Sequence, residues 1–199
     1  MSNISKGDSE RDFFVWIDPK NFIIKHQIEK VGGFASTPPN ENNETLMFIP
    51  NPNFKGWVSY FQNNLLDFYI AEYNLELSRR HVFKQYPSRL QAIFLLDTEK
   101  EAHEYAKTHP EHIGKRILKR VKTSGNYIYS KHDSSWVDFL RMVGMKDKDT
   151  IHNCTTCYWN GTLVKDCELQ HFGEAWTQEP IVEILFLGRI EFYDRNLTV

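Results

Sequence analysis

The sequence has little of what marks a secreted or membrane-bound protein. It contains only three cysteines among 199 residues, an odd number that cannot form a complete disulfide framework. No window holds the roughly 18 apolar residues that a membrane span needs, and the first residues have no signal-peptide core. These features predict a soluble, cytoplasmic protein with no membrane partner.

An excess of one charge is missing as well. The chain has 24 Lys and Arg against 26 Asp and Glu, a net charge of −2, so no overall field attracts duplex DNA. One basic cluster, in residues 115–122, favours the solvated face of a strand, with phosphate binding as the alternative.

The motifs of three common enzyme classes are also absent. The sequence contains no glycine-rich phosphate loop, no Gly-x-Ser-x-Gly elbow and no His-Glu-x-x-His pair. Their absence excludes the usual nucleotide triphosphatases, α/β-hydrolases and zinc proteases.

What is present predicts a single α+β domain over residues 1–199, because 41% hydrophobic residues suffice for a sizeable core. We expect about three helices and six to eight short strands, with residues 1–11 frayed. The helices are predicted at 53–81, 98–109 and 134–143, and the strands at 13–18, 46–49, 90–95, 116–122, 127–129 and 180–193.

A central unit runs from Tyr86 to Pro110. Pro87 favours a turn that carries Ser88 and Arg89, and the apolar run after it predicts a buried strand. The sequence from Thr98 to Glu101 then matches a capping box, which starts a helix that ends at Pro110. Turns held at the end of a rigid strand often carry binding groups, so Ser88 and Arg89 are candidates for such a role.

All three cysteines lie close together with a histidine, as Cys-x2-Cys-x9-Cys-x3-His. Thiolates and imidazoles are the ligands that zinc prefers, but the spacing is unusual and residues 158–164 have the pattern of a strand that faces a core. We therefore favour ordinary reduced cysteines over a zinc site made by Cys154, Cys157, Cys167 and His171.

Glu183 interrupts an otherwise apolar strand, Ile181 to Leu187. A buried carboxylate must be paired, hydrogen-bonded or protonated, so Glu183 is either functional or part of a structural pair. The pattern alone leaves these two interpretations open.

Several motifs together resemble a known family: the paired Arg79 and Arg80, the aromatic-Pro-Ser-Arg turn, the Tyr-Trp-Asn-Gly run from Tyr158 and the strand around Glu183. They are similar to those of a bacterial and phage family grouped with the ADP-ribosyltransferase-like folds. The resemblance covers roughly the C-terminal two-thirds of the chain.

The resemblance implies two small, packed, mostly antiparallel sheets with NAD bound between them. It implies that NAD is a substrate for ADP-ribosyl transfer, or for a glycohydrolase reaction, with an unidentified protein or nucleic acid as the acceptor. Glu183 matches the family's late-strand glutamate and is the predicted catalytic residue. The predicted NAD-binding residues are Ser88, Arg89, Tyr127, Tyr158, Trp159 and Trp16.

The sequence departs from the family pattern in two places. The first strand carries Trp16 where related sequences place a histidine, so Arg79, Arg80 or His81 would have to supply the missing cation. The Glu-x-Glu pair of arginine-modifying enzymes is also missing, which makes arginine a disfavoured acceptor. Two alternatives stay open: an inactive binding or inhibitor protein that keeps the cleft, and a small zinc-dependent interaction module.

Overall fold

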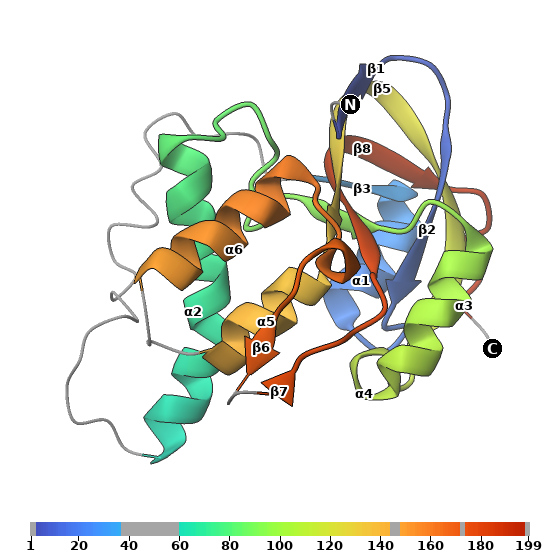
Figure 1. Cartoon of the computed structure of the whole chain (residues 1–199). Helices are drawn as coiled ribbons and strands as arrows, with labels where there is room; N and C mark the ends of the chain where they lie inside the picture. The colour runs from blue at the N-terminus through green and yellow to red at the C-terminus, as the bar shows by residue number, and fades with distance from the viewer. Residues whose placement is uncertain (1–2, 37–59, 144–147, 172–173, 198–199) are drawn as a thin grey trace.

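Two long antiparallel strands form the centre of the fold (Figure 1), β5 (Ile117–Asp133) and β8 (Val182–Phe192). The computed structural model describes residues 3–36, 60–143, 148–171 and 174–197. The register of the two strands shifts between Ser124 and Ile128. At this shift Gly188 has a φ of 149°, and a Cβ atom there would lie 2.9 Å from that of Tyr127. The absence of a side chain thus allows the two strands to stay close where they bend.

Four short strands pair with the outer edges of this central pair. β1 (Ile4–Gly7) and β2 (Asp12–Ile17) pair with opposite ends of β5, whereas β3 (Gly33–Ala35) and β4 (Ile93–Leu95) pair with opposite ends of β8. The backbones of Phe14 and Leu96 exchange two hydrogen bonds of 2.9 Å, which join β2 to the end of β4. The six strands therefore form one continuous antiparallel sheet, within which this bridge links β2 to the end of β4.

The second sheet differs from the expected pair of small packed sheets. Among the described residues it consists of β6 (Gln170–His171) and β7 (Glu174–Ala175). The mostly antiparallel character is confirmed, but nearly all strands belong to one sheet because β5 and β8 run through both of its halves.

Helices are more numerous than the three predicted. The described residues contain six α-helices, of which α2, α5 and α6 pack against one another on one side of the sheet, and α3 and α4 lie beside β2 (Figure 1). Their bounds are α1 Phe22–His26, α2 Tyr60–His81, α3 Glu99–Thr108, α4 Pro110–Ile113, α5 Ser135–Val143 and α6 Lys148–Asn160, with a π-helical turn at Gln27–Val31 and a 3-10 turn at Val164–Asp166.

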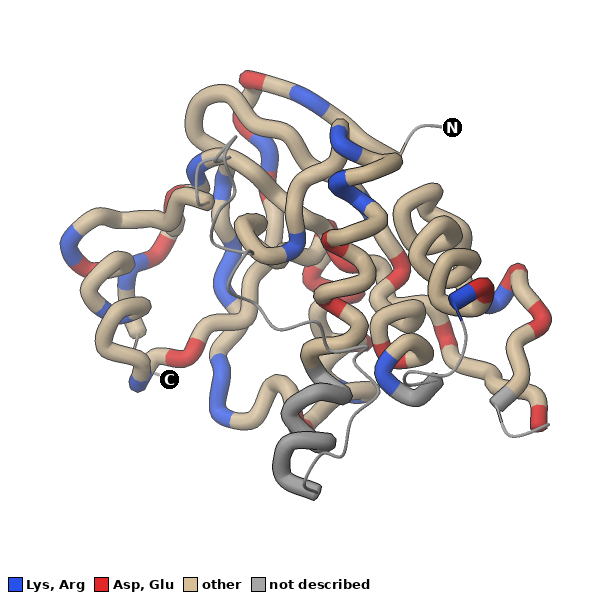
Figure 2. Tube along the Cα trace, turned by 90° about the vertical axis from the view of Figure 1, so that its left-hand side faces the viewer, with Lys and Arg blue, Asp and Glu red and all other residues tan. Residues whose placement is uncertain are grey.

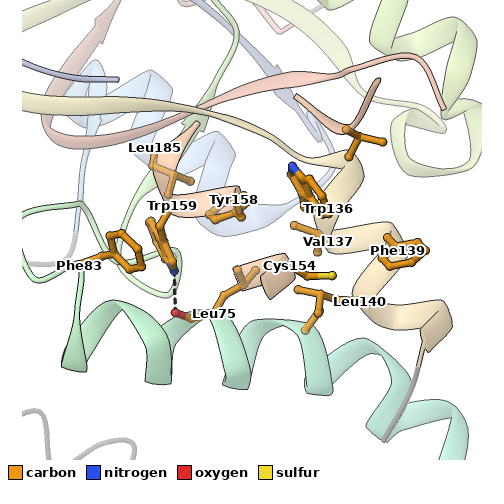
Figure 3. Packing of buried hydrophobic residues seen from close by; sticks show 12 residues of the cluster. Leu75, Phe83, Trp136, Val137, Phe139, Leu140, Cys154, Tyr158, Trp159 and Leu185 are labelled. Atoms are coloured by element: carbon orange, nitrogen blue, oxygen red, sulfur yellow. Dashed lines mark hydrogen bonds between the residues drawn. The ribbon is translucent and has the colours of Figure 1, made fainter. Parts of the chain in front are cut away.

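Two apolar cores hold these layers together. The first lies between α2, α5, α6 and the sheet, with Trp136, Tyr158 and Trp159 all at most 1% exposed (Figure 3). The second lies on the sheet and includes Phe13 and Phe186, both fully buried. Large aromatic rings thus supply much of the buried area in both cores.

Several elements confirm the predicted local signals. Strand β2 alternates, with Phe13, Val15 and Ile17 buried and the residues between them only half-buried. Helix α3 begins with the predicted capping box, in which Thr98 Oγ1 accepts from the backbone of Glu101 and Glu101 accepts from the backbone of Thr98. The strand predicted at 180–193 is present as one long strand, β8.

Other predictions were wrong or fall outside the described residues. The expected frayed N-terminus contains β1, and Asn3 is anchored by Tyr86, whose hydroxyl donates to Asn3 Oδ1 over 2.6 Å. Tyr158 and Trp159 lie on helix α6 rather than on a strand. The two predicted strands at 116–122 and 127–129 are parts of the single strand β5. The strand predicted at 46–49 lies outside the described residues, as does the start of the helix predicted from residue 53.

Charges of both signs alternate along the chain trace (Figure 2). In the basic cluster Lys119, Arg120 and Lys122 form ion pairs with acidic residues of neighbouring segments. These pairs match a solvated strand face. Among the described residues, no helix is long and apolar enough to cross a lipid bilayer.

Candidate functional site

The turn before β4 brings Ser88 and Arg89 into the protein interior. Ser88 is 4% exposed and Arg89 is 8% exposed, so the expected polar surface turn is buried. The hydroxyl of Ser88 donates to Glu76 Oε2 over 2.8 Å, and Glu76 also binds Arg79 and Arg80. Ser88 and the two arginines therefore have structural partners, and none of the three lines the cavity described below.

Helix α2 supplies the carboxylates that make this burial possible. Glu72 and Glu76 are four residues apart, so they lie on the same face of the helix. Glu72 binds Arg89 with two hydrogen bonds, from Nε over 2.7 Å and from Nη2 over 2.9 Å. Such a paired geometry fits a planar guanidinium and holds it in one orientation.

Glu183 completes this network from strand β8. Its Oε1 atom accepts hydrogen bonds from Arg89 Nη1 and from the hydroxyl of Tyr158, the latter over 2.7 Å. Arg89 Nη1 also lies 2.7 Å from the same hydroxyl. We define Glu72, Arg89, Tyr158 and Glu183 as the Arg89 network. Within the described part of the chain, both contacts of the Glu183 carboxylate end on Oε1.

The two carboxylates of the network have opposite pKa shifts. Burial raises the pKa of Glu183, and Arg89 and Tyr158 only partly offset that effect. Burial acts in the same direction on Glu72, but there the attraction of Arg89 outweighs it, and the pKa of Glu72 is lowered. Burial opposes the charge of Arg89, yet the nearby carboxylates, Glu183 first, hold its pKa well above the usual value. Arg89 thus stays charged between the two carboxylates.

A cavity of about 260 Å³ opens beside this network. Its walls come from β2, β4, α3, α4, α5 and the start of β8, and they combine aromatic rings with basic groups. The lining residues are Phe14, Val15, Trp16, Arg89, Phe94, Leu95, Leu96, Tyr105, His109, His112, Ile113, Arg116, Ser134, Val137, Asp138, Arg141, Ile181 and Glu183.

The structure brings three of the predicted site residues to this cavity: Trp16, Arg89 and Glu183. Trp16 occupies an outward position of β2, and its indole nitrogen donates to the carbonyl of Ala102 over 3.3 Å. Tyr158 lies behind the cavity wall as a partner of Arg89 and Glu183. It is fully buried, so it positions these residues instead of stacking on a ligand.

Two further candidates for NAD binding are corrected. Trp159 is fully buried, and its indole nitrogen donates to the carbonyl of Leu75 over 2.9 Å (Figure 3). Tyr127 is 8% exposed and stacks on Phe186, with ring centroids 5.6 Å apart. Neither residue lines the cavity, because both rings fill the apolar cores.

The cysteines lie away from this cavity. Cys154 and Cys157 are on α6 and Cys167 follows the 3-10 turn, and all three are free thiols. Burial raises the pKa of Cys154 to about 12, which opposes the thiolate form that a metal needs. In the described segments these thiols do not form a cluster of metal-ligand atoms, and the side chain of His171 lies outside them.

Sequence reasoning missed several residues of the site. Tyr105, His109, His112 and Arg116 line the cavity from the α3–α4 segment. Their signal is a group of His and Tyr residues on either side of Pro110. Arg116 belongs to the basic cluster for which the sequence favours a solvated strand face over phosphate binding. The sequence contains no indication of a role for His132. Its Nδ1 atom forms a hydrogen bond of 2.8 Å with the backbone carbonyl of Tyr158 and so helps to hold Tyr158 in place.

Comparison with protein families gives one match. Residues 13–195 match the family described as "Protein of unknown function (DUF2441)". The chain belongs to the DUF2441 family. The match includes the whole Arg89 network and every residue that lines the cavity of this DUF2441 protein. A comparison with curated proteins found no match.

Proposed function

We propose that this DUF2441 protein consumes NAD, transferring ADP-ribose to a macromolecular acceptor or to water. The observation that carries the proposal is the position of Glu183: a carboxylate held by Arg89 and Tyr158 in the wall of an aromatic and cationic cavity. The late-strand position of this glutamate also matches the resemblance to ADP-ribosyltransferase-like folds.

The chemistry requires one fixed carboxylate. Breaking the bond between nicotinamide and ribose develops positive charge on the ribose, and a preorganised negative group stabilises that charge. Glu183 is 13% exposed at its side chain, so little water competes for it. Oε1 is held by Arg89 and Tyr158, and Oε2 is the atom we assign to the ribose.

The cavity offers partners for the other parts of NAD. Trp16 and Tyr105 present aromatic groups for a nicotinamide or adenine ring, and the exposed Arg116 presents a guanidinium for the diphosphate. The volume of about 260 Å³ lies just below the usual range for small-molecule sites. It suits one nucleoside with its phosphate better than a whole dinucleotide, so the remainder of NAD would extend from the opening.

The Arg89 ion pair favours a second candidate, a protein that binds such a nucleotide without turnover. The charge of Glu183 is partly balanced by Arg89, and burial raises the pKa of the carboxylate. Both effects reduce the negative charge with which Glu183 could stabilise a ribosyl cation. This candidate is the inactive binding or inhibitor protein considered from the sequence.

The three free thiols suit a reducing compartment, and we place either activity in the cytoplasm.

The test compares release of nicotinamide from NAD by the wild type and by Glu183→Gln. Gln keeps the shape and the acceptor oxygen for Tyr158 but removes the charge, so turnover should fall by roughly two to three orders of magnitude with NAD binding retained. Glu179→Gln, a change at an exposed carboxylate four residues earlier, should leave turnover unchanged. Saturable NAD binding without any nicotinamide release by the wild type would favour the binding protein, and no NAD binding at all would reject both candidates.

A further inference from the structure

A second group of side chains lies at the cavity wall, at the junction of α3 and α4. His109, Glu111 and His112 place their ligand atoms within 4.8 Å of one another. His109 and His112 line the cavity, whereas the Arg89 network does not include either of them. The Arg89 network therefore does not account for this group of side chains.

The local backbone brings these side chains together. His109 ends α3 with φ −128° and ψ 60°, and Pro110 then starts α4, where its missing N–H costs nothing. His109 and His112 are three residues apart, so their rings come to the same side and stack with centroids 5.1 Å apart. The carboxylate of Glu111 lies near one nitrogen atom of each ring.

The distances approach those of a metal centre. Glu111 Oε1 lies 3.6 Å from His109 Nδ1 and 3.8 Å from His112 Nε2. Tetrahedral zinc with bonds of about 2.0–2.1 Å separates its ligand atoms by roughly 3.4 Å, so small side-chain rotations would suffice.

Tyr105 orients one of the ligands. Its hydroxyl lies 3.2 Å from His112 Nδ1. With the proton on Nδ1, the imidazole donates a hydrogen bond to the hydroxyl oxygen of Tyr105, and the lone pair of Nε2 is left free to bind a metal. A ligating histidine is commonly held in this way by a hydrogen bond from its other ring nitrogen. Arg116 Nη1 donates to the carbonyl of His112, which uses one N–H of this guanidinium and leaves the others for a ligand.

We propose that His109, Glu111 and His112 form a binding site for a divalent transition metal, with zinc as the best match. Two imidazoles and one carboxylate are typical of zinc sites that keep a fourth position open, and imidazole disfavours magnesium and calcium. Because His109 and His112 line the cavity, the ion would lie in its wall. The site uses none of the cysteines considered for zinc from the sequence.

The experiment measures zinc binding by calorimetry in a Cys157→Ser, Cys167→Ser background, which removes the two more accessible thiols. We expect about one zinc per chain with a dissociation constant in the micromolar range or lower, and no heat from magnesium. Combined His109→Ala and His112→Ala changes should weaken zinc binding by 100-fold or more, estimated from the roughly 10- to 100-fold effect of losing only a supporting partner. His103→Ala, an exposed histidine on α3, is the matched control and should bind zinc as the wild type does.

A change at an exposed ligand separates the loss of metal binding from the loss of the fold. Glu111 is 64% exposed, so Glu111→Gln should fold normally and still bind zinc at least roughly 10-fold more weakly. Cobalt substituted into the cysteine-containing protein should give no thiolate charge-transfer band. No zinc binding by the background protein, or equal affinity in the His109, His112 double variant, would overturn the proposal. Neither the zinc titration nor the cobalt spectrum depends on NAD. A failure of the zinc proposal can therefore be distinguished from a failure of the proposed function.

Discussion

Tyr158 stacks on His132, with ring centroids 4.6 Å apart and ring planes 19° from parallel. The carbonyl of Tyr158 can only accept a hydrogen bond, so the Nδ1 atom of His132 carries the proton and Nε2 accepts from the hydroxyl of Ser130. This neutral imidazole supports the tyrosine that holds Glu183. The orientation of the candidate catalytic carboxylate therefore depends on a histidine on β5.

The first prediction concerns acid stability. Burial lowers the pKa of His132 to about 3. Between that value and about 6.5 the unfolded chain binds a proton that the folded chain does not, so stability is lost as the pH falls through this range. At about pH 5 this histidine alone should cost about 2 kcal/mol relative to neutral pH. Urea unfolding of His132→Gln at both pH values should give a smaller loss than the wild type.

Two comparisons isolate this effect. The raised pKa of Glu183 acts in the opposite direction, because its protonated form is favoured in the folded state and stability grows as the pH falls toward and below that pKa. The difference between wild type and variant removes this common contribution. His103→Gln, which changes an exposed histidine, should keep the wild-type pH dependence, and an identical pH dependence in His132→Gln would contradict the prediction.

The second prediction concerns Arg89. Its replacement by Ala leaves Glu72 and Glu183 buried without their cation, which should lower the free energy of unfolding by about 3–5 kcal/mol. Arg89→Lys should restore only part of this loss, because an ammonium cannot form the paired contact with Glu72. Urea unfolding measures both. A melting temperature unchanged by Arg89→Ala would mean that the network contributes little, as the exposed pair of Arg120 and Asp12 is expected to do.

The third prediction concerns Asp133, at the end of β5. This residue is 1% exposed and accepts hydrogen bonds of 2.8–3.0 Å from the backbone nitrogens of Ser135, Val164 and Ile181. Asp133→Asn turns one acceptor into a donor facing a backbone N–H, so we expect a loss of about 2–4 kcal/mol in the free energy of unfolding. Asp166→Asn, at an exposed carboxylate two residues after Val164, should change it by less than about 0.5 kcal/mol. Equal stability of the two variants would contradict this role.

The fourth prediction concerns the phosphate partner in the cavity. Arg116 is exposed, so Arg116→Ala should leave the melting temperature nearly unchanged. Loss of one charge-assisted contact should weaken binding of ADP-ribose by about 10-fold, measured by calorimetry. Arg120→Ala removes an exposed arginine outside the cavity and should have no effect on affinity. Equal affinity for wild type and Arg116→Ala would remove Arg116 from the site.

Local signals in the sequence predicted local structure well. The alternation in β2 and the Thr98 capping box depend on neighbouring residues, and both are present as predicted. Helix α6 was missed because Tyr158 and Trp159 have high strand propensity, although Cys154 and Tyr158, four residues apart, already share a buried helical face. Here packing against α2 and α5 overrides the propensity of single residues.

The site was predictable only in part, for a physical reason. Glu183 was recognised as a carboxylate in an apolar strand, and that oddity is visible in the sequence alone. The burial of Arg89 was not predictable, because its compensating partner Glu72 lies 17 residues away on a helix whose facing side is set by tertiary packing. Likewise, Tyr158 reaches the same carboxylate only because α6 packs with α2 and α5 on one side of the sheet (Figure 1).

The pairing of β8 also affects when this protein can fold during synthesis. β8 is the last strand of the large sheet in chain order, and β3, β4 and β5 all pair with it. A nascent chain that stops before Val182 therefore leaves three strands with an unpaired edge, and it also lacks the carboxylate that Arg89 and Tyr158 bind. The pairs of β1 and β2 with β5 need no later residues, but β3 and β4 can join the sheet only after β8 has left the ribosome. Contacts between such distant segments also form slowly. Until then the unpaired strand edges can associate with other chains.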